Sequence, residues 1–245
     1  MLFNRSSVAV LIPARYESTR FPGKVLVSID DKPMIQHIYE AARQSPYVST
    51  VRVVTDDARI ETAVRNFDGA VSVVDRPCRT GSDRVAAAIQ DLDEEIVVNW
   101  QADEIPRDPG LLDDLIRPFL ADPSAQMGTL MRKAQPSDNP SDPSVVKVVT
   151  DRRSRALYFS RAPIPYVRDR PTGSQRGDYW LHLGLYIFRR ETLLRFAELP
   201  TGTWEAAEQL EQLRALEFGI PVHVWETHVQ SVRIDTPDDL IHANR

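Results

Sequence analysis

The chain of 245 residues has one cysteine, no long apolar run and no excess of positive charge, and each absence excludes a class of protein. The single thiol, Cys78, can form neither an internal disulfide nor a cysteine metal site. No segment approaches the roughly 20 apolar residues that cross a bilayer, so we expect a cytoplasmic protein without membrane insertion. A net charge of -5 argues against a nucleic-acid partner, because such binding draws most of its affinity from clustered lysine and arginine.

Several common catalytic and phosphate-binding patterns are also missing. The sequence has neither the GxxxxGK[ST] nor the GxGxxG spacing, and it has no HxxxH metal pair and no GxSxG elbow. What it does have is the composition of an ordinary globular protein, with 42% hydrophobic and 27% charged residues. Any ligand must therefore be recognised by a less generic arrangement of side chains.

Short apolar runs rich in β-branched residues alternate with helical patterns along the chain. This alternation predicts an α/β fold, with a mixed, mostly parallel sheet flanked by helices. The runs predicted as strands are residues 8–12, 50–54, 71–74, 96–99, 128–131, 145–149, 156–159, 183–188 and 223–225. The patterns predicted as helices are residues 34–42, 59–66, 82–92, 110–120, 204–217 and 237–244.

The texture of the chain changes near residue 137, where a turn-rich link begins and the predicted strands follow one another more closely. We therefore expect a single domain over residues 1–245 with an inserted lobe. Its core would comprise approximately residues 1–136, the smaller lobe residues 137–228, and the return to the core residues 229–245.

The most informative segment, residues 12–24, follows the first predicted strand and has the sequence IPARYESTRFPGK. Three cations, Arg15, Arg20 and Lys24, stand there among turn-forming prolines and a glycine. In open α/β sheets, ligands bind outside the carboxyl ends of the strands. This segment, called the cationic loop below, therefore predicts an anion site, and a nucleoside triphosphate is the expected ligand.

Two aspartates follow predicted or short strands and are candidate metal ligands. Asp103 comes after the strand at 96–99, and Asp235 ends a short predicted strand before the last predicted helix. Mg²⁺ usually takes one or two protein carboxylates and completes its octahedron with water and phosphate oxygens. Both residues also have structural alternatives, since Asp103 suits a helix cap or a solvated turn and Asp235 suits the cap of the last helix. Sequence spacing does not show whether the two carboxylates meet.

The turn at residues 76–84 combines a glycine and hydroxyls with cations near a predicted helix start. The backbone amides of Gly81 and Ser82 would suit a base or phosphate oxygen, although an ordinary capped turn explains the segment as well.

Further candidates lie in the second half of the chain. Arg161 stands between apolar residues and two prolines, which fits recognition of a carboxylate or phosphate, or else a structural ion pair. His182 could hydrogen-bond a sugar hydroxyl or serve as a structural histidine. Glu208 and Gln212 fall on one face of the helix predicted at 204–217, where a solvated stripe is the usual explanation.

Taken together, these segments resemble the 3-deoxy-manno-octulosonate cytidylyltransferases, or CMP-Kdo synthetases, which couple CTP to the eight-carbon 2-keto sugar acid Kdo. Besides the cationic loop, the segments that carry the resemblance, in the family's order, are 32–35 (KPMI), 53–56 (VVTD), 80–84 (TGSDR), 101–104 (QADE), 146–149 (VKVV), 156–162 (ALYFSRA), 182–186 (HLGLY), 210–214 (LEQLR) and 234–240 (IDTPDDL). The resemblance covers nearly the whole chain.

The resemblance implies a Rossmann-like nucleotidyltransferase fold, Mg²⁺ as the cofactor, and a sugar-binding lobe that also supplies a homodimer contact. It implies an enzyme that makes a CMP-sugar and pyrophosphate from CTP and Kdo for lipopolysaccharide or capsule biosynthesis. By position, the nucleotide-binding residues would be Pro13, Ala14, Arg15, Lys24, Arg76, Gly81, Ser82 and Gln101. The sugar-binding residues would be Arg20, Gln101, Arg161, His182, Tyr186, Glu208 and Gln212. The catalytic residues would be Arg15, Lys24, Asp103 and Asp235, of which the two aspartates would bind the metal.

Three positions depart from the family's pattern. Ala102 replaces a glycine, Ile105 replaces a proline, and Leu181 replaces a basic residue. These changes leave open a variant acidic sugar, such as an amino-substituted Kdo, a sialate-like acid, or another acidic acceptor.

Two rival interpretations differ more. A CMP-sialate synthetase is disfavoured, because those enzymes more often continue the proline-alanine-arginine start with a glycine-serine-lysine pattern. A catalytically silent nucleotide-binding module would belong to another class of protein, and the retained Lys24, Asp103 and Asp235 argue against it.

Overall fold

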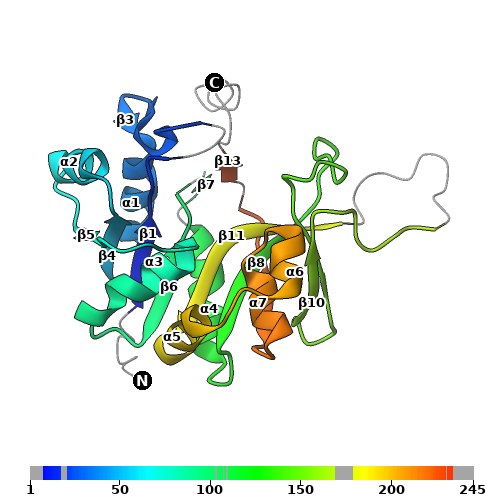
Figure 1. Cartoon of the computed structure of the whole chain (residues 1–245). Helices are drawn as coiled ribbons and strands as arrows, with labels where there is room; N and C mark the ends of the chain where they lie inside the picture. Colours follow the sequence, from blue (N-terminus) through cyan, green and yellow to red (C-terminus); the bar gives the residue numbers. More distant parts are fainter. Residues whose placement is uncertain are drawn as a thin grey trace. The chain divides into compact units, whose positions relative to one another are not determined.

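The computed structural model of the chain contains two compact units, each described by itself below (Figure 1). The structure describes residues 8–17, 21–102, 104–106, 108, 110–168, 179–229 and 231–233. Unit 1 comprises Met1–Asp113, Phe188–Ala197 and Val229–Arg245, and unit 2 comprises Asp114–Ile187 and Glu198–His228. The predicted division at residue 137 assigns nucleotide binding to one part of the chain and sugar binding to another, and this assignment stays a prediction.

Unit 1 is built on a parallel sheet in which the strands run in the order β6-β1-β4-β5. These strands are β1 (Val8–Pro13), β4 (Val48–Thr55), β5 (Val71–Val73) and β6 (Ile96–Trp100). The first five residues of β1 are fully buried, as expected for the central strand of a sheet covered on both faces. All four strands were predicted from their apolar runs, and the predictions are confirmed.

Helices follow the strands of unit 1 in alternation. They are α1 (Met34–Gln44), α2 (Ala58–Asn66) and α3 (Gly81–Ala88), and α3 continues into the 3₁₀ turn η2 (Ile89–Asp91). Asp57 caps α2 by accepting a hydrogen bond from the amide of Arg59, and Thr80 caps α3 by accepting one from the amide of Asp83. The three helices were predicted, whereas α5 (Arg190–Glu198), most of which also belongs to unit 1, was not.

Smaller elements complete unit 1 around the strand ends. The 3₁₀ turn η1 (Lys24–Leu26) closes the cationic loop, and β2 (Ser28–Ile29) pairs with β3 (Lys32–Pro33). A second ladder joins β7 (Glu104–Pro106) and β13 (Ser231–Arg233), which are more than 100 residues apart in the sequence. The helix predicted at 237–244 lies outside the described residues.

Unit 2 contains β8 (Met127–Lys133), β9 (Lys147–Thr150), β10 (Ala156–Ser160), most of β11 (Trp180–Arg189) and β12 (Val222–Glu226). Strand β9 is antiparallel to both β10 and β11, and β12 is parallel to β8. The helix α4 (Gly110–Ala121) leads into this unit from residue 110. The strands predicted in this part of the chain are confirmed, and the tighter succession of strands produces the antiparallel pairs.

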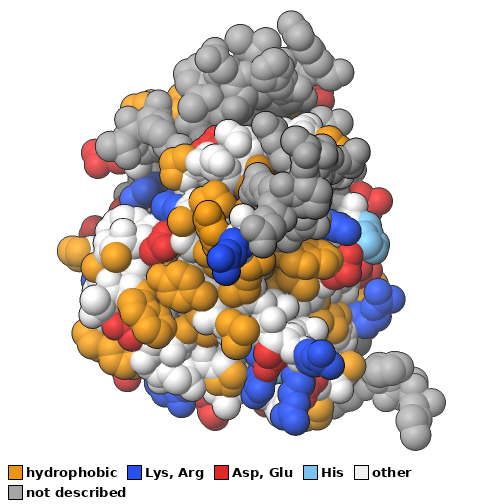
Figure 2. All heavy atoms as spheres, turned by 90° about the vertical axis from the view of Figure 1, so that its right-hand side faces the viewer, with side chains coloured by type: hydrophobic (Ala, Val, Ile, Leu, Met, Phe, Trp, Pro, Cys, Tyr) orange, Lys and Arg blue, Asp and Glu red, His pale blue; other side chains and the backbone are white. Residues whose placement is uncertain are grey.

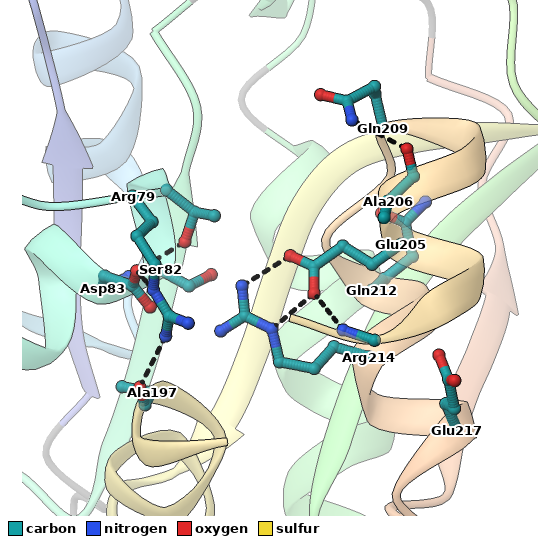
Figure 3. A network of polar contacts seen from close by, with 12 residues as sticks. Arg79, Ser82, Asp83, Ala197, Glu205, Ala206, Gln209, Gln212, Arg214 and Glu217 are labelled. Carbon is teal, nitrogen blue, oxygen red and sulfur yellow. Dashed lines mark hydrogen bonds and ion pairs between the residues drawn. The ribbon is translucent and has the colours of Figure 1, made fainter. Parts of the chain in front are cut away.

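The helix predicted at 204–217 is not continuous. It is divided into α6 (Thr203–Glu208) and α7 (Gln212–Glu217), because Gln209 adopts a left-handed conformation with φ 52°. The two short helices are held together by a buried ion pair, in which Arg214 donates to Glu205 through Nε at 2.8 Å and Nη2 at 2.5 Å (Figure 3). The prediction of one long helix was therefore wrong at its centre.

Among the helices that the structure describes, none is both long enough and apolar enough to cross a membrane.

Candidate functional site

The cationic loop is closed on itself by a short backbone contact. The amide of Gly23 donates to the carbonyl of Tyr16 at 2.7 Å, and η1 begins immediately afterwards with Lys24. Gly23 has φ 72°, and a Cβ at this position would lie 3.0 Å from Cε2 of the Tyr16 ring, so glycine is required there on two grounds. Arg15 is exposed and Lys24 is half-buried, while Arg20 lies outside the described residues.

The residues predicted to surround a nucleoside meet at the end of β1. The amide of Ala14 donates to the carbonyl of Val54 at 2.9 Å, which continues the parallel pairing beyond the strand. A Cβ on Gly81 would lie 3.3 Å from Cγ of Pro13, so the first turn of α3 packs directly against the start of the cationic loop. The structure thus places Gly81 against Pro13, next to Ala14, although Gly81 lies far from both residues in the sequence.

The turn at residues 76–84 is rigidly built. The guanidinium of Arg79 donates to Asp83 at 3.0 Å and to the carbonyl of Ala197 at 3.1 Å (Figure 3), and Arg84 donates to Asp56 at 2.8 Å. Arg76, at the start of the turn, is exposed.

Ser82, another residue predicted to bind the nucleotide, is held in place by Asn99, to which the sequence assigned no role. Nδ2 of Asn99 donates to Oγ of Ser82 at 2.9 Å, and both side chains are buried. Within the described part of the chain, Oδ1 of Asn99 is buried without a hydrogen-bond partner. Asn99 could have been identified from the sequence as a polar amide near the carboxyl end of a buried strand, because a buried polar group needs a partner.

The two candidate metal ligands, Asp103 and Asp235, lie outside the described residues. Their neighbours do not, and the antiparallel ladder between β7 and β13 pairs Glu104 with Arg233. Asp103 directly precedes Glu104 in the sequence, and Asp235 stands two positions after Arg233. Both aspartates therefore adjoin the same end of one ladder in the sequence. Gln101, which follows β6, is half-buried.

Two of the three departures from the family's pattern have a structural explanation. Ile105 packs against the apolar cluster of Ile29 and Met34, so this side chain serves the core of unit 1. Leu181 is buried in an apolar cluster with Ala134 and Tyr179 in unit 2. Ala102, the third departure, is buried.

In unit 2 the structure brings together five predicted residues from separate segments, which we call the unit 2 cluster: Arg161, His182, Tyr186, Glu208 and Gln212. The hydroxyl of Tyr186 donates to Oε1 of Gln212 at 3.0 Å, and both side chains are buried. Nε2 of Gln212 has no hydrogen-bond partner in the described part of the chain, which leaves a buried amide donor available to a ligand. The ring of His182 lies 5.4 Å from that of Tyr186, and its Nε2 is 3.0 Å from the hydroxyl of Thr129.

Glu208 and Arg161 form the other half of the unit 2 cluster. The carboxylate of Glu208 accepts hydrogen bonds from the hydroxyl of Ser160 at 2.7 Å and from the amide of Arg161 at 2.9 Å. The guanidinium of Arg161 donates to three backbone carbonyls, those of Pro143, Glu208 and Gln209. Arg161 thus anchors the break between α6 and α7, an arrangement that neither of its two predicted roles included.

Lys147 is a buried cation to which the sequence assigned no role. Its ammonium donates to the carbonyl of Val145 at 2.5 Å, to that of Asp142 at 3.4 Å and to that of Arg161. Burial lowers the pKa of Lys147, and the charges of Asp142 and Glu208 act in the opposite direction. A lysine in the middle of an apolar run was the signal that could have identified it, since lysine is rarely buried without partners.

Comparison with known proteins gives this geometry a family. The model of a family described as cytidylyltransferase matches residues 9–224. A 3-deoxy-manno-octulosonate cytidylyltransferase of Geobacter sulfurreducens is 45% identical over 241 residues, which cover 96% of each protein. The chain belongs to the 3-deoxy-manno-octulosonate cytidylyltransferase family. A relative of the same name from Solibacter usitatus is 44% identical over 235 residues, covering 96% of this chain and 92% of that protein.

Solved structures agree with this membership. The chain is similar to a CMP:2-keto-3-deoxy-manno-octonic acid synthetase in complex with CTP, with a TM-score of 0.89, 38% identity, and coverage of 98% and 97% of the two chains. A glucose-1-phosphate thymidylyltransferase from Bacillus anthracis shares the fold at 15% identity and a TM-score of 0.66. The protein is therefore a nucleotidyltransferase of the cytidylyltransferase type with a Rossmann-like fold, as the sequence predicted.

Proposed function

We propose that this cytidylyltransferase makes CMP-Kdo and pyrophosphate from CTP and Kdo, and that it serves the synthesis of lipopolysaccharide or capsule. The observation that carries the proposal is the similarity, over 98% of the chain, to a CMP:2-keto-3-deoxy-manno-octonic acid synthetase in complex with CTP. The anomeric hydroxyl of the sugar attacks the α-phosphorus in line, an O–P bond forms, and the bond to pyrophosphate breaks. The hydroxyl proton leaves to solvent.

Two residues of the cationic loop would hold the triphosphate. Arg15 and Lys24 flank the contact between Tyr16 and Gly23, so the closed loop supports the backbone beside each cation. Two polyanions meet in this reaction, and fixed positive charge both offsets their repulsion and stabilises the charge that develops on the phosphoryl oxygens. These residues position CTP and carry no covalent step.

The cytidine would lie over the contact between the cationic loop and α3. Pro13 and Gly81 touch there, Ala14 is fixed by its backbone, and the hydroxyl of Ser82 is held by Asn99. A rigid, small-residue surface of this kind suits a planar base, and Arg76 is exposed next to it.

Asp103 and Asp235 would hold Mg²⁺. A pair of carboxylates has the donor chemistry that this ion prefers, and the pairing of Glu104 with Arg233 supports a common site for the two aspartates. When bound, the ion would neutralise phosphate charge and lower the pKa of the attacking hydroxyl, so that no side-chain base is required.

The unit 2 cluster would bind the acidic sugar. Nε2 of Gln212, which has no partner among the described residues, offers a donor. Tyr186 orients that amide, and the ring of His182 lies beside Tyr186. Glu208 and Arg161 hold the break between α6 and α7 and so fix the position of Gln212 at the start of α7. Gln101 and Arg20 would also contact the sugar acid.

We also propose that the enzyme is a homodimer. Strand β10 is a terminal strand of the sheet, and unit 2 exposes several large apolar side chains, with Leu157 60% exposed, Tyr166 86% and Trp204 43%. Figure 2 shows that hydrophobic side chains gather on the face of unit 2 where Figure 1 draws β10 and α6. Such a surface supports a subunit contact. In analytical ultracentrifugation the enzyme should sediment as a dimer, and Leu157→Glu should shift it towards monomer; a wild-type monomer would contradict the proposal.

The substrate assignment is tested with a panel of nucleoside triphosphates crossed with 2-keto sugar acids in the presence of Mg²⁺. We expect pyrophosphate release to be fastest with CTP and Kdo. Faster release with an amino-substituted Kdo or a sialate would replace the sugar assignment, and nucleotide binding without release from any pair would indicate a silent module.

A further inference from the structure

The cationic loop is attached to α2 by a stacked pair of side chains. The guanidinium carbon of Arg59, in the first turn of α2, lies 3.3 Å from the centroid of the Tyr16 ring. The same ring is in such close contact with Gly23 that a Cβ there would come within 3.0 Å of two of its carbons. One aromatic ring therefore links α2 to both ends of the loop's closing contact.

Asp57 sets the orientation of this guanidinium. Its carboxylate accepts from Nε of Arg59 at 2.9 Å and from Nη2 at 2.6 Å, so the planar fork is held along one edge. The amide of Asp57 in turn donates to the hydroxyl of Thr55 at 3.1 Å, and Thr55 is buried at the end of β4. The chain of contacts runs from a core strand, through Asp57 and Arg59, to the ring of Tyr16.

Fixing Tyr16 and Gly23 also fixes the two residues next to them. Arg15 directly precedes Tyr16, and Lys24 directly follows Gly23. When a protein segment becomes ordered on binding, the lost conformational entropy weakens the affinity for the ligand. A segment that is already ordered before binding therefore binds the triphosphate more tightly. Cations that already stand in place also need no reorganisation during the reaction.

We propose that Arg59 is a positioning residue for nucleotide binding, which acts by stacking on Tyr16 and so holding the neighbouring Arg15 and Lys24 in place for the triphosphate. This proposal rests on the proposed function, in which Arg15 and Lys24 bind CTP. Arg59 itself has one edge bound to Asp57 and one face on the ring, so its role is to organise the loop.

The exposure of Arg59 separates this role from a general structural one. Its side chain is 58% exposed, and exposed ion pairs contribute little to global stability. Removal of the guanidinium should therefore change the loop and leave the fold intact. The same helix provides a matched control, because Arg65 is 65% exposed and pairs at 2.7 Å with Glu61, one turn earlier.

The test compares Arg59→Met with Arg65→Met in the full enzyme. For Arg59→Met we expect the KM for CTP to rise about threefold to tenfold, the range that follows from losing an exposed cation–π contact together with its ordered loop. The KM for the sugar acid should stay at its wild-type value, and the Tm should fall only slightly, because solvent screens the exposed pair of Arg59 and Asp57. Arg65→Met should leave all three quantities unchanged. Arg59→Lys should fall between wild type and Arg59→Met, since an ammonium can cover the ring but lacks the fork that Asp57 binds.

A double-mutant cycle with Tyr16→Leu tests the stacking directly. If Arg59 acts through the ring, Arg59→Met should add little to the KM for CTP once Tyr16 has been replaced. Fully additive effects would overturn the proposed route. So would equal effects of Arg59→Met and Arg65→Met.

Failure of this inference is distinguishable from failure of the proposed function. An unchanged KM for CTP in Arg59→Met, alongside a raised KM in Lys24→Ala, would overturn only the positioning role of Arg59. An unchanged KM for CTP in Lys24→Ala would overturn both, because the loop would then not bind the triphosphate.

Discussion

Two cations of unit 2 donate to backbone carbonyls of the segments around the sugar-side residues. Lys147 binds carbonyls at 142, 145 and 161, and Arg161 binds carbonyls at 143, 208 and 209. Carbonyls at a helix end and in a turn have no partner within their own element, and a charged donor satisfies them more strongly than a neutral one. The two side chains therefore hold three separate segments in one arrangement.

Replacement of Lys147 tests this arrangement. Lys147→Met keeps the length of the side chain but leaves buried carbonyls without a donor, so the free energy of unfolding should fall by about 2–4 kcal/mol. The KM for the sugar acid should rise while the KM for CTP stays constant. Urea unfolding and steady-state kinetics measure these quantities. Lys133→Met, at an exposed position on β8, is the matched control. A stability loss of the same size in both variants would contradict the role given to Lys147.

The metal proposal makes a sharper prediction about single residues. Asp103→Ala and Asp235→Ala should each lower turnover by about 10²-fold or more, the usual loss for one electrostatic catalytic group. Asp103→Asn and Asp235→Asn preserve the size of the side chain and should be affected in the same way. Pyrophosphate release measured against Mg²⁺ concentration checks this. Near-normal release by either alanine variant would remove that residue from the metal site.

At the scale of elements, α6 and α7 show how a tertiary contact overrides local pattern. Glu205, Glu208 and Gln212 keep a helical spacing of three and four across residue 209, so the sequence predicts one helix. Arg161, 48 residues earlier, binds the carbonyl of Gln209 at 3.1 Å and that of Glu208 at 2.6 Å, which satisfies the end of α6. No local signal announces this partner, and the break could not be read from residues 204–217 alone.

Gln209 provides the test at this scale. A β-branched residue tolerates its φ of 52° poorly, so Gln209→Val should lower the free energy of unfolding by about 1–2 kcal/mol. Gln209→Gly removes the same side-chain bond to Ala206 but accepts this backbone conformation, and should be close to wild type. Chemical denaturation of the two variants measures the difference. Equal destabilisation would mean that the left-handed residue is not needed.

The strands were predictable for a related reason. Runs such as 8–12 and 96–98 are apolar throughout because they are buried on both faces, and that composition is visible in the sequence. The candidate site was less accessible. The sequence around Arg161 fitted either recognition of a carboxylate or phosphate or a structural ion pair. Only the resemblance to a family assigned this residue to sugar binding. The role of Asn99 was not predictable because its partner, Ser82, is distant in the sequence. The role of Lys147 was not predictable because its partners are backbone carbonyls, those of residues 142 and 161 among them.

For the whole molecule, the described carboxyl groups with shifted pKa values predict sensitivity to acid. Hydrogen bonds from Arg59 lower the pKa of Asp57 to about 2, and a hydrogen bond from Lys32 is the main cause that lowers the pKa of Glu40. The pKa is also below its ordinary value in Glu94, Asp122, Asp138, Asp151 and Glu217.

The sign of the effect follows from proton uptake. The unfolded chain, with carboxyl pKa values near 3.8 and 4.5, binds more protons in acid than the folded chain does. Stability from these groups is therefore complete above pH 4.5 and is lost as the pH falls towards 2. Urea unfolding between pH 6 and pH 2 should show a free energy that decreases below about pH 4.5. A free energy that stays level or rises over this range would contradict the shifts.

We expect the enzyme to act on the α-phosphorus of CTP. ³¹P NMR of the enzyme with CTP, Kdo and Mg²⁺ follows the phosphorus atoms directly. We predict that a sugar-linked phosphodiester of CMP and pyrophosphate appear together in equal amounts, at the rate at which CTP disappears. Free CMP or CDP in place of the phosphodiester, or CTP that stays intact, would contradict the account.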